Sequence, residues 1–311
     1  MGRVYFVNGF LGAGKTRFIQ ELLEEDYFKI KGKTLLLLCE EGETEYDDYL
    51  MQNLNVEIKK IENEEDFTPD NLTNIEKESN PERIIIEFNG MWMRKDLEFP
   101  WYWNDIMEIA IFDTPSFDMY ARNMKSLLSE QVRNAYMAVF FSADGFKDKL
   151  ATYRRNVKAV NPKLNIVFKD RDGDDIVTRF EDELPYDLNA PLIDITDDAF
   201  AAFYLDSLDN IDRYIGKRVR FTAQVMKTKD QTRKAFLAGR MALTCCEQDL
   251  SLFGVICDYD QIDELIHGSW AVIEGTLSKE FFSKYENEFL ICKVEDIQIC
   301  GKPKKEIIDV I

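Results

Sequence analysis

Short apolar runs alternate with helical patterns over the first two thirds of the chain. Near-continuous apolar runs are typical of strands that are buried on both faces of a parallel sheet. We expect such strands at 3–8, 34–39, 83–88, 107–113, 136–142 and 164–168. Helical patterns lie at 16–27, 70–79, 117–134, 146–160 and 174–183. The repeated strand–helix order predicts an open, mostly parallel α/β sheet with helices on both faces.

The pattern changes near residue 214, where short alternating strands replace the helices. We expect them at 217–227, 235–246, 250–257, 269–278 and 289–299. In the first, Val219, Phe221, Ala223 and Val225 share one face, as in a half-buried antiparallel strand. Five short strands fit an OB-like barrel. We therefore predict an α/β domain at 1–196, a helical connector at 197–213 and a small β domain at 214–311.

Composition limits the classes of binding partner and the cellular location that we expect. The 311 residues include 39 Lys and Arg against 58 Asp and Glu, a formal charge of −19. Such a surface repels phosphate backbones, so nucleic acid is excluded as the main partner. No apolar run approaches the ~20 residues that span a bilayer, and the first residues lack a signal-peptide pattern. We expect a cytoplasmic protein with no membrane insertion, and this pattern leaves its oligomeric state open.

The stretch GFLGAGKT, from Gly9 to Thr16, matches G-x-x-x-x-G-K-[ST] between a buried strand and an amphipathic helix. Its glycines let backbone N–H groups and the helix N-terminus face a chain of phosphates. Lys15 neutralises the β and γ phosphates, and the Thr16 hydroxyl can ligate Mg²⁺. The motif predicts a bound nucleoside triphosphate, and with the strands and helices around it a sheet of the P-loop NTPase type. Its expected nucleotide contacts are Gly9, Gly12, Ala13, Gly14, Lys15, Thr16 and Arg17.

This stretch also resembles the phosphate loop of the CobW family of P-loop GTPases, many of which are metal chaperones or metallocentre-insertion proteins. A second match is CEEGETEYD, from Cys39 to Asp47, which is similar to the family's N-E-F-G-E-V-G-I-D. The resemblance implies that Asp47 contributes to the magnesium shell and that Glu40 and Glu43 form a metal-sensitive switch. Without the resemblance, a solvated acidic loop is the simpler interpretation.

A third match is RIIIEFNG, where Glu87 and Gly90 fit the family's Glu-x-x-Gly. Ligands of open α/β sheets bind at the carboxyl ends of the strands. The resemblance implies that Glu87 is in the outer magnesium shell or orders the attacking water, so that Lys15 and Glu87 are the catalytic candidates. Gly90 is then a hinge that senses the γ-phosphate. The alternative for Glu87 is a charge that caps a strand end.

Two departures limit the resemblance. Typical CobW-like metal chaperones carry Cys-x-Cys-Cys, whereas the stretch 56–71 here has no cysteine, and Glu62, Glu64 and Glu65 are hard, weak substitutes for thiolates. The guanine-reading Asn-Lys-x-Asp is replaced by residues 141–144, FSAD, in which only Asp144 is kept. This loss weakens the expected selectivity for guanine: GTP is still expected over ATP, ATP or a looser specificity stays open, and Asp144 is the expected base contact. Phe141 stacks on a base or is a core residue at a strand end.

The last hundred residues resemble the soluble C-terminal domain of a bacterial family described as permease subunits. The resemblance rests on Gly239, Arg240, Cys245, Cys246 and Asp249. Cys245 and Cys246, like Glu40 and Glu43, are candidates for a second metal such as Zn²⁺, if the fold brings further ligands close. The alternative is that both cysteines are small apolar residues of the β domain.

Together these features predict a CobW-like nucleoside triphosphatase. Hydrolysis is expected to be slow and Mg²⁺-dependent, because no arginine finger can be identified. The resemblance implies a switch linked to metal homeostasis, a metalloprotein or a transport partner. The alternative is a module that holds nucleotide without hydrolysis and whose C-terminal β domain docks on a membrane transporter subunit.

Overall fold

The computed structural model describes the chain except residues 1–2, 41, 43, 178–183, 228–232, 244–249, 284–286 and 310–311. Its contacts divide the chain into two compact units, each described by itself below. Unit 1 comprises Met1–Leu150 and Lys163–Thr178, and unit 2 comprises Ala151–Pro162 and Arg179–Ile311. The domain boundaries expected at 196 and 213 stay predictions.

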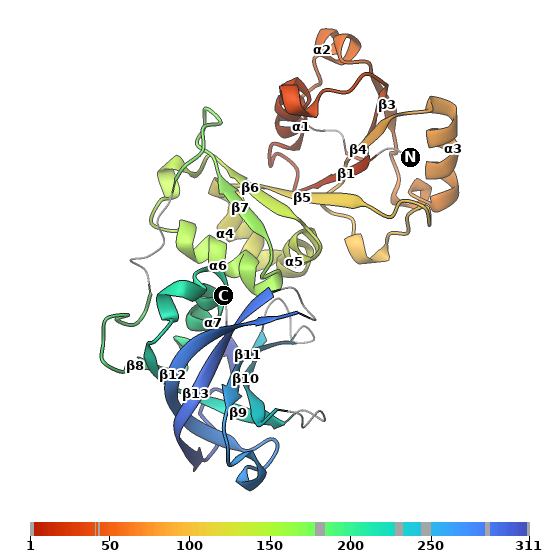
Figure 1. Cartoon of the computed structure of the whole chain (residues 1–311). Coiled ribbons are helices and arrows are strands. Elements are labelled where there is room, and N and C mark those ends of the chain that lie inside the picture. Colours follow the sequence, from red (N-terminus) through yellow and green to blue (C-terminus); the bar gives the residue numbers. More distant parts are fainter. Residues whose placement is uncertain are drawn as a thin grey trace. The chain divides into compact units, whose positions relative to one another are not determined.

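Unit 1 is built on a seven-stranded sheet in which neighbouring strands pair in parallel, in the order β3-β2-β4-β1-β5-β6-β7. The strands are β1 (Arg3–Asn8), β2 (Thr34–Leu38), β3 (Val56–Lys60), β4 (Arg83–Glu87), β5 (Ile106–Asp113), β6 (Met137–Phe141) and β7 (Asn165–Phe168). Figure 1 shows β1 in the middle of this sheet, beside β4 and β5. The loop that follows β1 therefore lies at the centre of the carboxyl edge.

Helices cover both faces of this sheet. They are α1 (Lys15–Glu24), α2 (Asp48–Asn53), α3 (Pro69–Ser79), α4 (Thr114–Asn123) and α5 (Lys125–Arg133). Successive side chains of a strand point to opposite faces. Accordingly, Phe6 of β1 belongs to one buried cluster with Leu72 of α3, and Val7 belongs to another with Ile19 of α1. The predicted parallel α/β sheet is confirmed.

Three elements of unit 1 differ from the expectation. The sequence pattern missed β3, an edge strand whose VEIKK side chains are mostly half-buried. The helix expected at 117–134 is two helices, α4 and α5, which Met124 interrupts with a φ of −131°. No helix forms at 174–177, where Asp175 makes an isolated bridge to Lys169. The rest of that expected helix, 178–183, lies outside the described residues.

Unit 2 is rich in β structure. Its strands are β8 (Ile193–Ile195), β9 (Arg218–Lys227), β10 (Ala235–Leu243), β11 (Leu250–Asp258), β12 (Trp270–Phe282), β13 (Asn287–Cys300) and β14 (Ile307–Asp309). The pairing runs β9-β10-β11-β13-β12 and returns to β9, so these five strands close a circuit. The face of β9 that was expected to be buried is buried. The prediction that a small β domain follows the α/β sheet is confirmed.

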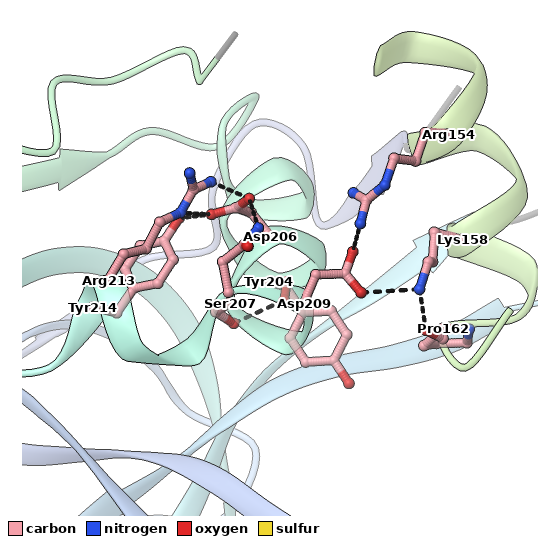
Figure 2. Close-up of polar contacts among 10 residues, drawn as sticks. Arg154, Lys158, Pro162, Tyr204, Asp206, Ser207, Asp209, Arg213 and Tyr214 are labelled. Carbon is pink, nitrogen blue, oxygen red and sulfur yellow. Dashed lines mark hydrogen bonds and ion pairs between the residues drawn. The ribbon is translucent and has the colours of Figure 1, made fainter. Parts of the chain in front are cut away.

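Two helices of unit 2 are joined by charged side chains: α6 (Leu150–Val160), which enters this unit at Ala151, and α7 (Phe200–Asp209). Figure 2 shows the Asp209 carboxylate between two cations of α6, accepting hydrogen bonds from Arg154 and, at 2.9 Å, from Lys158. Along the chain, α6 connects β6 to β7, two strands of unit 1. The helix between two strands of the parallel sheet is thus held by ion pairs of unit 2.

Candidate functional site

The loop Gly9–Thr16 leads from β1 straight into α1 at the carboxyl edge of the sheet. Gly14 precedes the helix with a φ of 96°, in the left-handed region that glycine adopts at little cost. Glycine offers no side chain to cap the first amides of α1. Such an uncapped helix N-terminus suits an anion.

Lys15 points back into this loop. Its side chain is 4% exposed, and Nζ donates to the carbonyls of Gly9 at 2.7 Å and Phe10 at 3.0 Å. The third partner is Glu40, whose Oε2 lies 2.5 Å from Nζ. An ammonium group has three N–H donors, so these three partners use all of them.

Thr16 and Glu87 meet beside Lys15. Thr16 Oγ1 donates to Glu87 Oε1 at 2.8 Å, and Tyr46 Oη donates to the other oxygen of the same carboxylate. Glu87 ends β4, the neighbour of β1, which explains how residues 71 positions apart come together. No spacing rule in the sequence pointed to Tyr46.

Burial controls the electrostatics of this cluster. Burial raises the pKa of Glu87, although the hydrogen bonds from Tyr46 and Thr16 act in the opposite direction. Burial likewise raises the pKa of the Tyr46 hydroxyl, and the charge of Glu87 adds to that effect. The pKa of the neighbouring Cys39 thiol is also raised, chiefly by burial. A poorly solvated carboxylate of this kind is stabilised by a nearby cation.

Two described residues that follow β2, Gly42 and Tyr46, lie beside this cluster. A Cβ on Gly42 would lie 4.0 Å from Thr16 Oγ1, which places the backbone of this residue beside the threonine. Residues of both the cluster and the chain after β2 line a cavity of about 370 Å³. Its lining includes Thr16, Glu40, Gly42, Thr44, Tyr46 and Glu87. Glu43, the other expected switch residue, lies outside the described residues.

Asp47 has a different setting from that implied by the resemblance. Its Oδ1 accepts hydrogen bonds from the amides of Tyr49 at 2.8 Å and Leu50 at 3.1 Å, so it caps α2. The residue is exposed. Its assignment to the magnesium shell stays a prediction.

Gly90 lies against the phosphate loop. A Cβ at this position would sit 2.2 Å from the carbonyl oxygen of Gly9, so only glycine fits without displacing the loop. The Gly90 carbonyl accepts a hydrogen bond from Gln131 Nε2 at 3.2 Å. A movement of the chain after β4 would therefore displace Gly9 directly.

At the opposite end of the loop, Arg17 and Asp144 both contact Arg171. Arg17 Nη1 donates to the Arg171 carbonyl at 3.0 Å, and Asp144 Oδ2 lies 3.8 Å from Arg171 Nε. Phe141 is buried, and its ring packs against Gly14, so the core alternative holds for this residue. The expected base contact, Asp144, is exposed beside this arginine. Nothing in the sequence pattern had indicated Arg171.

The second-metal candidates are only partly covered by the structure. Cys245 and Cys246, and Asp249 of the same stretch, lie outside the described residues. Across the part of the chain that is described, no three His, Cys, Asp or Glu side chains are grouped to hold an ion. Cys257 and Cys292 are buried register partners on β11 and β13.

The residues around Lys15 fit a nucleotide with Mg²⁺. The Thr16 hydroxyl donates a hydrogen bond to Glu87, which leaves the lone pairs of the hydroxyl oxygen for a cation. Hydroxyl and carboxylate oxygens are the ligands that Mg²⁺ prefers. Lys15 and the start of α1 supply positive charge for phosphate at the same place.

A family model of the CobW/HypB/UreG nucleotide-binding domain matches residues 3–168, more than half of the chain. The chain belongs to the CobW/HypB/UreG family. A second model, the DUF1980 C-terminal domain, matches residues 172–308 of this CobW/HypB/UreG protein. Both resemblances expected from the sequence are thereby confirmed. No curated protein matches the chain.

Several solved structures are similar to this chain at low sequence identity. The hydrogenase maturation factor HypB from Archaeoglobus fulgidus is 17% identical over 54% of this chain and 81% of its own, with a TM-score of 0.42. Zn(II)-bound YjiA GTPase from E. coli is 18% identical over 88% and 94%, with a TM-score of 0.40. HypB from Helicobacter pylori in complex with nickel is 14% identical over 53% and 77%, with a TM-score of 0.35. Within the described residues, the chain has no helix of the length and apolarity needed to cross a bilayer.

Proposed function

We propose that this protein binds a nucleoside triphosphate with Mg²⁺ and hydrolyses it slowly, with GTP favoured over ATP. The observation that supports this most directly is the meeting of Lys15, Thr16 and Glu87 at the carboxyl ends of β1 and β4, with Thr16 Oγ1 2.8 Å from Glu87 Oε1. Lys15 is a cation that can bind phosphate, and Thr16 carries a hydroxyl that can bind the metal. Glu87 is a carboxylate that accepts the hydrogen bond of that hydroxyl.

Each side chain has a defined part. The loop amides and the start of α1 face the phosphates, and Lys15 donates N–H groups to them. Thr16 presents its lone pairs to the metal because its O–H group donates a hydrogen bond to Glu87. When bound, Mg²⁺ neutralises phosphate charge and orients the nucleotide. Asp144 accepts hydrogen bonds from the purine edge, which favours guanine.

The surroundings of Arg17 support slow turnover. Its guanidinium donates to Glu21 at 2.6 Å and to the Arg171 carbonyl at 3.0 Å. The arginine nearest the loop therefore already has partners on the side where the base is expected, away from the γ-phosphate. P-loop switches that lack an arginine at the γ-phosphate hydrolyse slowly.

The switch is proposed to serve metal handling in the cytoplasm, through a metalloprotein or transporter subunit that binds unit 2. The CobW/HypB/UreG membership supports the link to metals, and the DUF1980 match supports a separate role for unit 2. The closed circuit of β9 to β13 supports our interpretation of this unit as OB-like. Zn²⁺ at Cys245 and Cys246 belongs to the same proposal and is tested by elemental analysis of wild type and the double serine variant.

The experiment is phosphate release from GTP and ATP, with and without Mg²⁺. Wild type is expected to release phosphate from GTP faster than from ATP, and Lys15→Ala and Glu87→Gln to lose at least tenfold in rate. Lys149→Ala, which removes a lysine half-exposed to solvent in the same unit, is the matched control. Release that does not depend on Lys15 would overturn hydrolysis at this site. Lys15-dependent binding without release would instead support the non-hydrolysing module that docks on a membrane transporter.

A further inference from the structure

Two buried cysteines of unit 2 face each other and have no part in the proposed nucleotide site. Cys257 lies on β11 and Cys292 on β13, and they are partners in the register of these parallel strands. Both residues are 0% exposed and belong to the same buried cluster. The two thiols also hydrogen-bond to each other. Their side chains therefore point to the same side of the sheet, into the core of unit 2.

The spacing of these strands suits a disulfide between them. Neighbouring strands of a sheet lie about 4.8 Å apart. A disulfide usually joins two residues whose Cα atoms are about 4.4–6.8 Å apart. Register partners whose side chains point the same way meet this condition. A bond between Cys257 and Cys292 therefore requires a rotation of the two side chains and little movement of the backbone.

A pair of buried thiols can bind a metal or form a disulfide, and the surroundings of this pair favour the disulfide. Structural Zn²⁺ takes four ligands, and among the described residues no His, Asp, Glu or further Cys joins the pair to hold an ion. Burial raises the pKa of Cys257, and the neighbouring Cys292 thiol adds to that effect. A thiolate is therefore unfavourable in this core, whereas a disulfide carries no charge.

The two cysteines also lie at the place where the circuit of five strands is joined over the shortest distance. In the described part of the chain, β11 and β13 pair only at residues 256–258 and 291–293, whereas the other four junctions of the circuit are longer. Cys257 and Cys292 are the middle pair of this junction. Parts of a structure with few supporting contacts open locally before the rest. A bond between the two sulfurs would therefore hold the circuit closed at the junction that opens most easily.

We propose that Cys257 and Cys292 form a reversible disulfide that fastens the junction of β11 and β13. The oxidant is a low-molecular-weight disulfide, such as oxidised glutathione, which reaches the thiols when the junction opens. One cysteine thiolate attacks it, forms a mixed disulfide and releases one small thiol. The other cysteine thiolate then attacks the protein sulfur of the mixed disulfide and releases the second small thiol. The two cysteines lose two electrons and two protons, which the two released thiols carry away, and no nucleotide is needed.

The test treats the folded full chain with oxidised glutathione, blocks the remaining thiols and maps the disulfides by mass spectrometry after digestion without reductant. Wild type is expected to give a peptide pair linked through Cys257 and Cys292, which dithiothreitol separates. Cys292→Ala should leave Cys257 reduced or bound to glutathione. Cys300→Ala is the matched control, because it removes a cysteine of the same strand whose register partner is Trp270. We expect this control to form the same link as wild type.

A second measurement uses wild type alone, so it does not depend on the folding of any variant. Hydrogen exchange in peptides from β11 and β13 is expected to slow about tenfold or more after oxidation, while peptides from β1 and β4 exchange as before. A folded wild type that forms no link between Cys257 and Cys292, or forms it only after denaturation, would overturn the inference. A bond from Cys257 to a different cysteine would do the same, as would a link that leaves exchange in β11 and β13 unchanged.

Discussion

Asp209 provides a quantitative test of how α6 is held in unit 2. Its carboxylate accepts hydrogen bonds from Arg154 and Lys158, and the three side chains are 16%, 20% and 11% exposed. Removing it in Asp209→Ala deletes two hydrogen bonds between charged groups, worth about 1.5 kcal/mol each. Asp209 ends α7, where a negative charge opposes the helix dipole, so its loss returns about 0.5 kcal/mol. The net cost is about 2.5 kcal/mol.

This cost is best measured locally, because a chain with two units has no single unfolding free energy. Hydrogen exchange followed by mass spectrometry reports the opening of α6 and α7 separately. A loss of about 2.5 kcal/mol corresponds to exchange about 60-fold faster in these helices. Asp212→Ala is the matched control, since this side chain is 81% exposed and pairs with Lys279 at the surface. Exchange within threefold of wild type in Asp209→Ala, or equal acceleration in the control, would refute the reasoning.

Two further predictions concern unit 1. Gly90→Ala should weaken the binding of mant-labelled GTP at least tenfold in a fluorescence titration, because its Cβ would lie 2.2 Å from the Gly9 carbonyl oxygen. Gly301→Ala is the control: it has no atom within 4 Å of its Cβ and should bind as wild type does. Hydrogen bonds from Lys33 and Ser79 lower the pKa of Glu57 to about 2, so its ionised form stabilises the fold above the pKa of the unfolded chain, and this contribution is lost as the pH falls toward 2. After allowance for solvent screening, Glu57→Gln should cost about 1 kcal/mol at pH 7, measured by hydrogen exchange in β3 and α3, and about half of that near pH 3. A cost that does not change with pH would contradict this assignment.

The strands that carry the site could be predicted because they are buried on both faces. The central strands β1 and β4 are fully buried along most of their length, and continuous apolar runs predict such strands. Because β1 and β4 are parallel neighbours, the motifs at their ends were bound to meet, and Thr16 and Glu87 do. By contrast, β3 lies at the sheet edge with half-buried side chains, so its alternation of apolar and charged residues gave no comparable signal.

Tyr46 shows where sequence reasoning stops. A motif fixes which residues follow a strand, but the partner of a side chain in a loop depends on the path by which the loop folds back. The resemblance implied that Asp47 faces the metal, whereas in the structure Tyr46 faces Glu87 and Asp47 caps α2. Asp47 has extended backbone angles, with φ of −70° and ψ of 109°, and successive side chains of an extended segment point to opposite sides. Tyr46 and Asp47 therefore cannot both face Glu87 in one conformation. The contact of Tyr46 with Glu87 and the metal-shell role implied for Asp47 therefore require two different conformations of these residues. Displacement of Tyr46 from Glu87 would be the change that leads from the first conformation to the second.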